Sequence, residues 1–210
     1  SSVKVLSESI LLQEDVPKEM YVEFLHDIHS EVDRMTAIIN DLLTLVKLDQ
    51  KEVPLNFQEV DMNALLGDVV KRLQPLAKDK NVSLQLEGMK DIRATVDEMK
   101  LSLAISNLVD NAVKYTPEGG AVRVTLDADH QNAFITVADT GIGIPEDEIN
   151  HIFERFYRVD KTRDRETGGT GLGLSITHTT IMMHNGSIKV NSKEEEGTTI
   201  LVRIPLRHSS

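Results

Sequence analysis

The stretch N-L-V-D-N-A-V-K-Y-T occupies residues 107–116, at the end of a segment, 97–115, whose apolar spacing predicts a helix. Along one edge of that helix Asn107, Asn111 and Lys114 recur at i, i+4 and i+7. Amide oxygens suit Mg²⁺, and a lysine one turn further along can contact phosphate oxygens held by the same ion. We expect this edge to line a cleft, although a merely polar helix face would give the same pattern.

The next motif is D-T-G-I-G-I-P at residues 139–145, directly after an apolar strand at 133–139. A carboxylate at a strand end, in a partly buried pocket, can accept a hydrogen bond from the exocyclic amine of adenine. Glycines at 141 and 143 let the backbone pass close to a base. By itself the motif is also that of an ordinary tight turn.

A second glycine cluster, G-G-T-G-L-G-L-S at residues 168–175, opens a predicted helix that runs to 183. Backbone N–H groups at a helix N-terminus favour phosphates. Neither the dinucleotide fingerprint nor the P-loop matches, because the strand and acidic context and the Lys-Ser pair are missing.

Between the glycine clusters lies F-E-R-F-Y-R-V-D-K-T-R-D-R, residues 153–165. Five basic residues against three acidic ones make it locally cationic in a chain whose formal net charge is −11. We expect its aromatic residues to anchor one end and the rest to form a mobile lid over an anionic ligand. An ordinary solvated loop is the alternative.

The first part of the chain, 16–49, predicts one long amphipathic helix with a heptad seam. A seam needs a partner, so residues 3–13 are interpreted as the tail of an antiparallel helix, and two such hairpins would form a four-helix bundle. The alternative is a core helix that packs on its own domain. The seam consists of Leu25, Ile28, Val32, Met35, Ile39, Leu42 and Val46.

Composition shifts divide the chain into a partial helical hairpin, 1–49, a linker with Pro54, 50–56, and a second domain, 57–208. In that domain Asp61 is a good N-cap, and period-two alternation marks half-buried strands. The fold class expected is α+β, a two-layer sandwich of helices on a mixed sheet. The expected strands are 57–60, 82–87, 122–127, 133–139, 187–191 and 198–205, and the expected helices are 61–77, 97–115 and 170–183.

In this order and spacing, the four motifs resemble the N, first glycine, F and second glycine boxes of bacterial sensor histidine kinases in the GHKL ATPase superfamily. Gly197-Thr198-Thr199 resembles the last glycine box, and the helix end D-L-L-T-L-V-K-L-D, residues 41–49, resembles the second helix of that family's dimerisation domain. The resemblance covers nearly the whole chain. The F box and this helix separate it from the gyrase, mismatch-repair and chaperone branches.

The resemblance implies ATP and Mg²⁺ as ligands, with Asn107 on the metal and Asn107, Lys114 and Arg158 serving phosphoryl transfer. Asn111 would contact phosphate or metal, Tyr115 the ribose and base, and Asp139 the adenine amine. The remaining nucleotide contacts implied are Gly141, Gly143, Gly169, Gly171, Leu172, Gly173 and Thr199.

The resemblance also implies a phosphate acceptor in a motif like His-Glu-x-x-x-Pro, and no such string occurs in the sequence. Ser1-Ser2-Val3-Lys4 resembles the residues just after it, so we expect the acceptor histidine to be missing and autophosphorylation to fail. His29 is interpreted as a flank position rather than an acceptor. In the intact protein, a homodimer would form through the hairpin and a response-regulator receiver domain would dock there.

The composition excludes several other classes of protein. The chain of 210 residues has no cysteine, which excludes disulfides and thiolate metal sites and fits the cytoplasm. Its acidity argues against a nucleic-acid surface, and any membrane link would run through segments outside the chain. Two functional alternatives stay open: a nucleotide-binding docking module without turnover, and a GHKL ATPase of another branch.

Overall fold

The computed structural model describes residues 17–49, 55–88, 91–158 and 170–207, with the side chains of 47–49 excepted. The expected helix at 3–13, most of the linker, and the lid from 159 to 169 lie outside these ranges. The elements are α2 (Lys18–Asp49), β1 (Gln58–Asp61), α3 (Met62–Asp79), β2 (Ser83–Gly88), β3 (Arg93–Val96), α4 (Glu98–Tyr115), β4 (Ala121–Ala128), β5 (Asn132–Asp139), α6 (Gly173–Met183), β6 (Ser187–Lys193) and β7 (Gly197–Pro205).

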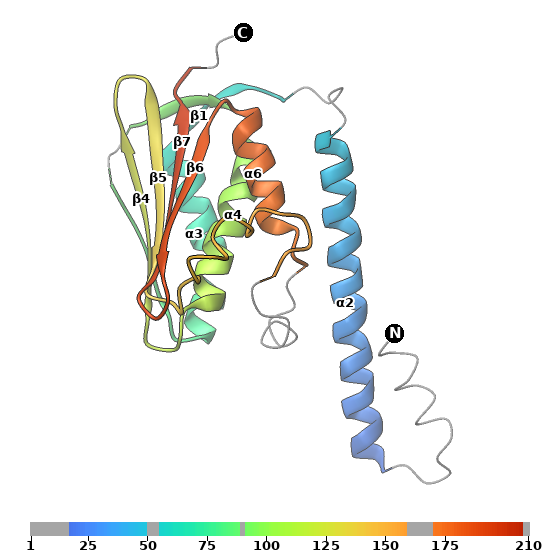
Figure 1. The fold of residues 1–210 in the computed structure, drawn as a ribbon. Helices are drawn as coiled ribbons and strands as arrows, with labels where there is room; N and C mark the ends of the chain where they lie inside the picture. The colour runs from blue at the N-terminus through green and yellow to red at the C-terminus, as the bar shows by residue number, and fades with distance from the viewer. Residues whose placement is uncertain (1–16, 50–54, 89–90, 159–169, 208–210) are drawn as a thin grey trace.

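Five strands form a mixed sheet in the order β2-β4-β5-β7-β6, and β1 pairs with β3 in a separate two-stranded sheet. The β2–β4 pair is parallel, and the other pairs are antiparallel. Helices α3, α4 and α6 cover one face of the five-stranded sheet (Figure 1). The two-layer α+β sandwich predicted from the sequence is confirmed.

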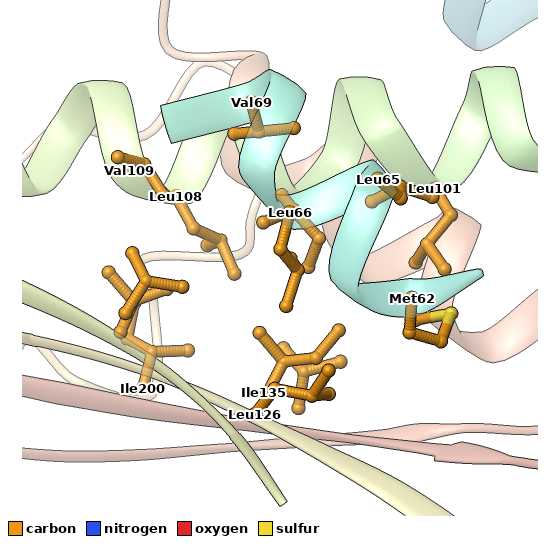
Figure 2. Packing of buried hydrophobic residues seen from close by; sticks show 14 of the residues in the cluster. Met62, Leu65, Leu66, Val69, Leu101, Leu108, Val109, Leu126, Ile135 and Ile200 are labelled. Atoms are coloured by element: carbon orange, nitrogen blue, oxygen red, sulfur yellow. The ribbon is translucent and has the colours of Figure 1, made fainter. Parts of the chain in front are cut away.

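The core fills the space between the sheet and the helices. Figure 2 shows Leu126, Ile135 and Ile200 of the sheet directed toward Leu66 of α3 and Leu108 of α4. Alternate strand residues supply this face because successive side chains point to opposite sides of a strand. Burying each such side chain stabilises the fold by about 1.5–3 kcal/mol.

Helix α4, which carries the Asn107 edge, is fixed at its start by two contacts. Asp97 is its N-cap, and the Asp97 carboxylate accepts from the Lys100 N–H at 3.0 Å. The Asp97 N–H donates to Nε2 of the buried His184 at 3.0 Å, while Nδ1 of His184 lies 2.8 Å from the Thr180 carbonyl oxygen. The Thr180 carbonyl only accepts, so Nδ1 carries the proton. Nε2 accepts from the Asp97 N–H and therefore carries none, so the imidazole is neutral. His184 thereby joins the end of α6 to the start of α4.

Several details differ from the sequence-based expectations. Strand β3 was not predicted, α3 continues through Pro75 to Asp79, and α6 begins at Gly173 rather than at 170. The last difference has a backbone cause, because Gly171 has φ +73°, which a right-handed helix excludes. The predicted N-cap at Asp61 is confirmed, since its carboxylate accepts from Asn63 N at 2.9 Å and from Ala64 N at 3.0 Å.

Helix α2 stands beyond α6, apart from the sheet (Figure 1). Its seam is largely exposed: Leu25 is 62% and Ile39 56% accessible. Among the described α2 side chains only Leu45 is buried, at 2%, where it packs with Leu172 and Ile176. The long helix is therefore not a core helix of the second domain. Within the described residues, no helix combines the length and apolar character needed to cross a membrane.

Candidate nucleotide-binding site

Asn107 joins the predicted metal-binding edge of α4 to the N-terminus of α6. Its side-chain amide nitrogen donates to the Gly173 carbonyl oxygen at 3.3 Å. Because Nδ2 is committed to this contact, Oδ1 on the other side of the planar amide is turned away from Gly173. An oriented amide oxygen beside the predicted phosphate loop fits a Mg²⁺ ligand.

Lys114 forms an ion pair with Asp110 one turn earlier on α4, with Nζ 2.6 Å from Oδ2. The sequence had given Asp110 no role. The two side chains are 31% and 29% accessible, so the pair contributes less than about 1 kcal/mol. A polyphosphate can therefore compete for the ammonium. Asn111 lies between them in sequence and is half-buried.

The C-terminal end of α4 is held by hydrogen bonds from Thr116, Lys80 and Ile142. Its last four carbonyl groups, which no further helical turn can satisfy, all accept hydrogen bonds. The donors are Thr116 Oγ1 to Ala112 O at 2.6 Å, Lys80 Nζ to Val113 O at 3.1 Å and also to Lys114 O, and Ile142 N to Tyr115 O at 3.2 Å. Burial lowers the pKa of the Lys80 ammonium. The backbone that carries Lys114 and Tyr115 is thus fixed, and Tyr115 adjoins the first glycine turn.

Asp139, at the end of β5, has one oxygen occupied and one available. Oδ1 accepts from Gly141 N at 2.8 Å and from Thr198 N at 3.1 Å, whereas Oδ2 accepts from none of the described residues. Burial raises the pKa of this carboxyl above its ordinary value, and the two N–H donors offset part of that rise. The geometry presents a single acceptor oxygen to a ligand.

The two glycines of the first turn lie against neighbouring backbone. A Cβ on Gly141 would come 2.7 Å from the Tyr115 carbonyl oxygen. A Cβ on Gly143, whose φ is +70°, would come 2.0 Å from the Lys193 carbonyl oxygen. Side chains are therefore excluded at both positions. The turn packs between the end of α4 and the β6–β7 hairpin.

The second glycine cluster and the F box meet at Gly171. The Gly171 carbonyl accepts from Phe156 N at 2.9 Å, and a Cβ on Gly171 would lie 3.3 Å from Cγ of Arg158. Arg158 is thus brought beside the predicted phosphate loop. Gly169 and the rest of the lid lie outside the described residues.

Leu172 and Thr170 connect the predicted phosphate loop to α2. The Leu172 side chain is fully buried in the cluster with Leu45 and Ile176, so only its backbone could contact a nucleotide. Thr170 Oγ1 donates to Asp41 Oδ2 at 2.5 Å. The end of the long helix therefore contacts the loop directly.

The last glycine box reaches the site through Thr198. Thr198 pairs with Asp139 across the sheet and shares its strand face with the core residues Ile200 and Val202, whereas Thr199 alternates to the other face. From the sequence we expected Thr199 to contact the nucleotide. The alternation of β7 carries the signal that distinguishes the two threonines.

A pH dependence follows from the raised pKa of the Asp139 carboxyl. The predicted role of Asp139 requires an ionised carboxylate to accept the adenine amine, so ADP affinity should fall as the pH drops through that raised pKa. Purine riboside diphosphate lacks the amine but shares the phosphate titration. Calorimetric titrations should give the steeper profile for ADP, and parallel profiles would rule out this role of Asp139.

Comparison with known proteins decides the family. The sequence model of the histidine kinase-, DNA gyrase B-, and HSP90-like ATPases matches residues 96–208. The chain belongs to this ATPase family. The sequence model of the His Kinase A (phospho-acceptor) domain matches residues 1–51, which places the chain among the histidine kinases.

Individual relatives of the chain are bacterial sensor kinases. It is 35% identical over 193 residues to the sensor histidine kinase WalK of Bacillus subtilis, covering 90% of this chain and 31% of that protein. It is 36% identical over 204 residues to the sensor-like histidine kinase SenX3 of Mycolicibacterium smegmatis, covering 97% and 53%. The crystal structure of full-length ShkA in complex with AMPPNP superposes with a TM-score of 0.76 at 26% identity, covering 100% and 42%. The chain thus spans about a third to a half of these relatives.

Proposed function

We propose that the chain is the ATP-binding catalytic core of a two-component sensor histidine kinase. It transfers the γ-phosphoryl group of ATP to a histidine on a phospho-acceptor hairpin, and an aspartate of a response-regulator receiver domain receives it next. Residues 1–49 are the hairpin segment, 50–56 the linker and 57–208 the catalytic domain. The cytoplasm is the proposed compartment, because ATP and the receiver domain are found there.

One observation supports the proposal: helix α4 is hydrogen-bonded at one position to the first turn of α6 and at another to the first glycine turn after β5. Asn107 is tied to the first turn of α6, Tyr115 to the first glycine turn, and Asp139 to that same turn. The adenine end then has an acceptor oxygen, and the phosphate end has amide, ammonium and guanidinium groups. A structural role for the polar edge of α4 explains neither the single acceptor of Asp139 nor the Arg158 side chain beside Gly171.

In the proposed reaction an imidazole nitrogen attacks the γ-phosphorus in line. A P–N bond forms, the bond from phosphorus to the β,γ-bridging oxygen breaks, and ADP leaves with that electron pair while the imidazole loses its proton to solvent or a base. Lys114 and Arg158 spread the charge that develops on the transferred oxygens. Asn107 Oδ1 would hold Mg²⁺, which would supply charge neutralisation at the phosphates.

Helix α2 is proposed to pair with a second copy. Its exposed seam side chains would be buried in a four-helix bundle, in which alternating three- and four-residue steps suit near-parallel packing. Sedimentation of a chain with Leu25→Asp, against wild type, would measure this association. If the seam mediates dimerisation, Leu25→Asp should be monomeric where wild type is dimeric. An unaltered oligomeric state in the variant would contradict the proposed pairing.

Phosphoryl transfer is tested with ATP labelled at the γ-phosphate, the chain, and a separate acceptor-bearing hairpin from a sensor kinase. We expect label on the hairpin in an acid-labile linkage, and none on a hairpin whose acceptor histidine is replaced by alanine. The chain with Lys114→Met is the matched enzyme control and should transfer at least about tenfold more slowly.

Two other outcomes of this assay would each indicate a different function. ATP binding without transfer to the hairpin would identify a docking module without turnover. Rapid release of inorganic phosphate in the absence of any hairpin would identify a free ATPase of another branch.

A further inference from the structure

The Ser192 hydroxyl lies where the β6–β7 hairpin meets the first glycine turn. Ile144 N donates to Ser192 Oγ at 2.8 Å, and Ser192 Oγ donates to the Gly197 carbonyl oxygen at 3.0 Å. Its third neighbour is Thr198 Oγ1, at 2.8 Å. Ser192 thus contacts both the glycine turn, which is expected to pass close to the base, and strand β7, which supports Asp139.

The direction of each of these bonds is fixed by chemistry. A hydroxyl has one proton to donate and two lone pairs to accept with. The Gly197 carbonyl can only accept, so the Ser192 proton goes there, and the Thr198 hydroxyl must donate to Ser192 Oγ. Every donor and acceptor of Ser192 is then used, and the hydroxyl of Thr198 is oriented as well.

Asp139 is one residue away in this chain of contacts. Thr198 N donates to Asp139 Oδ1 at 3.1 Å. In the sheet Asp139 lies opposite Thr198, and Thr198 lies opposite Ser192, so the three residues form one row across β5, β7 and β6. Displacing Thr198 would therefore displace the carboxylate oxygen that it holds.

The same hairpin also holds the glycine turn through its backbone. Glu195 N donates to the Ile142 carbonyl oxygen at 2.7 Å, and Gly143 approaches the Lys193 carbonyl too closely for a Cβ. Within the described residues, Ser192 supplies the hairpin's side-chain hydrogen bond to this turn. Removing its hydroxyl would leave the half-buried Ile144 N–H without its acceptor.

We propose that Ser192 is a positioning residue for adenine recognition. It holds the orientation of Asp139 through Thr198 without touching the nucleotide, while the backbone bond from Glu195 N to the Ile142 carbonyl oxygen holds the glycine turn independently of the Ser192 side chain. The inference rests on the proposed function, because it requires that Asp139 read the 6-amino group of adenine. A distant hydroxyl on the hairpin would then set the discrimination between purines with and without that amine.

The experiment measures the dissociation constants of ADP and of purine riboside diphosphate for three single variants. Ser192→Ala removes the hydroxyl, and Ser192→Thr keeps it. Ser187→Ala makes the same change at the other end of β6, where Ser187 accepts from Arg203 Nε at 3.1 Å. The ratio of the two affinities isolates the contact with the amine, because both ligands share the ring, ribose and phosphates.

For Ser192→Ala we expect ADP to bind about five- to tenfold more weakly and the analogue to change by less than about twofold, so that the ratio falls. Ser192→Thr should keep the ratio, and Ser187→Ala should leave both affinities unchanged. Equal losses for both ligands would indicate a merely structural role and overturn the inference, as would an unaltered ADP affinity. A wild-type chain that binds ADP no better than the analogue would overturn the adenine assignment itself, and the inference with it.

Discussion

Asn107→Ala should abolish magnesium-dependent binding of ATP while the chain stays folded. The substitution removes the amide oxygen proposed as the metal ligand, so the affinity gained from Mg²⁺, about 100-fold or more, should disappear. The fold should survive, because the change deletes one half-buried hydrogen bond, to the Gly173 carbonyl, worth about 1 kcal/mol. ATP titrations with and without Mg²⁺, beside thermal unfolding followed by circular dichroism, measure both effects.

Asn40→Ala is the matched control for this experiment. Asn40 is exposed on α2, so the same chemical change is made outside the candidate site. Its ATP affinity should equal that of wild type at every magnesium concentration. If Asn107→Ala also kept the wild-type response to Mg²⁺, the metal would have to be held elsewhere.

Gly143→Ala should nearly eliminate nucleotide binding for a steric reason. The new Cβ would lie 2.0 Å from the Lys193 carbonyl oxygen, and the backbone has φ +70°, which disfavours any side chain. The turn must move away from the hairpin, and with it the backbone that leaves room for the base. We expect at least a 50-fold loss of ADP affinity, on the order of 2–3 kcal/mol, and a comparable loss of unfolding free energy.

Gly67→Ala supplies the matched comparison in the same domain. Gly67 lies within α3, and a Cβ there would meet nothing within 4 Å. Alanine is the better helix former, so this variant should gain about 0.5–1 kcal/mol in urea unfolding and keep its ADP affinity. Wild-type affinity in Gly143→Ala would mean that the turn does not border the base.

Most of the fold could be predicted because hydrophobic periodicity and helix capping depend on residues close together in the sequence. Asp61 and Asp97 were recognisable as helix starts, and alternation identified the strands of the large sheet. Strand β3 was missed because four residues, R-A-T-V, carry little pattern and form a strand by pairing with the distant β1. The start of α6 was misplaced because the left-handed φ of Gly171 is a backbone property that composition does not specify.

For the candidate site, too, the local features could be predicted from the sequence and the tertiary contacts could not. The spacing of Asn107, Asn111 and Lys114 along one helix edge is visible in the sequence, and so is a carboxylate before a glycine turn. The supporting contacts are tertiary: Lys80 reaches α4 from the end of α3, and Ser192 reaches the turn from another hairpin. Their positions depend on how the helices and strands pack together, which no local pattern encodes.

The most direct test of the nucleotide site is a crystal structure of the chain with a non-hydrolysable ATP analogue and Mg²⁺. The structure described here predicts the adenine amine within hydrogen-bonding distance of Asp139 Oδ2, the metal on Asn107 Oδ1, and the phosphates beside Lys114 and the first turn of α6. A nucleotide bound elsewhere, or a purine turned away from Asp139, would contradict the account.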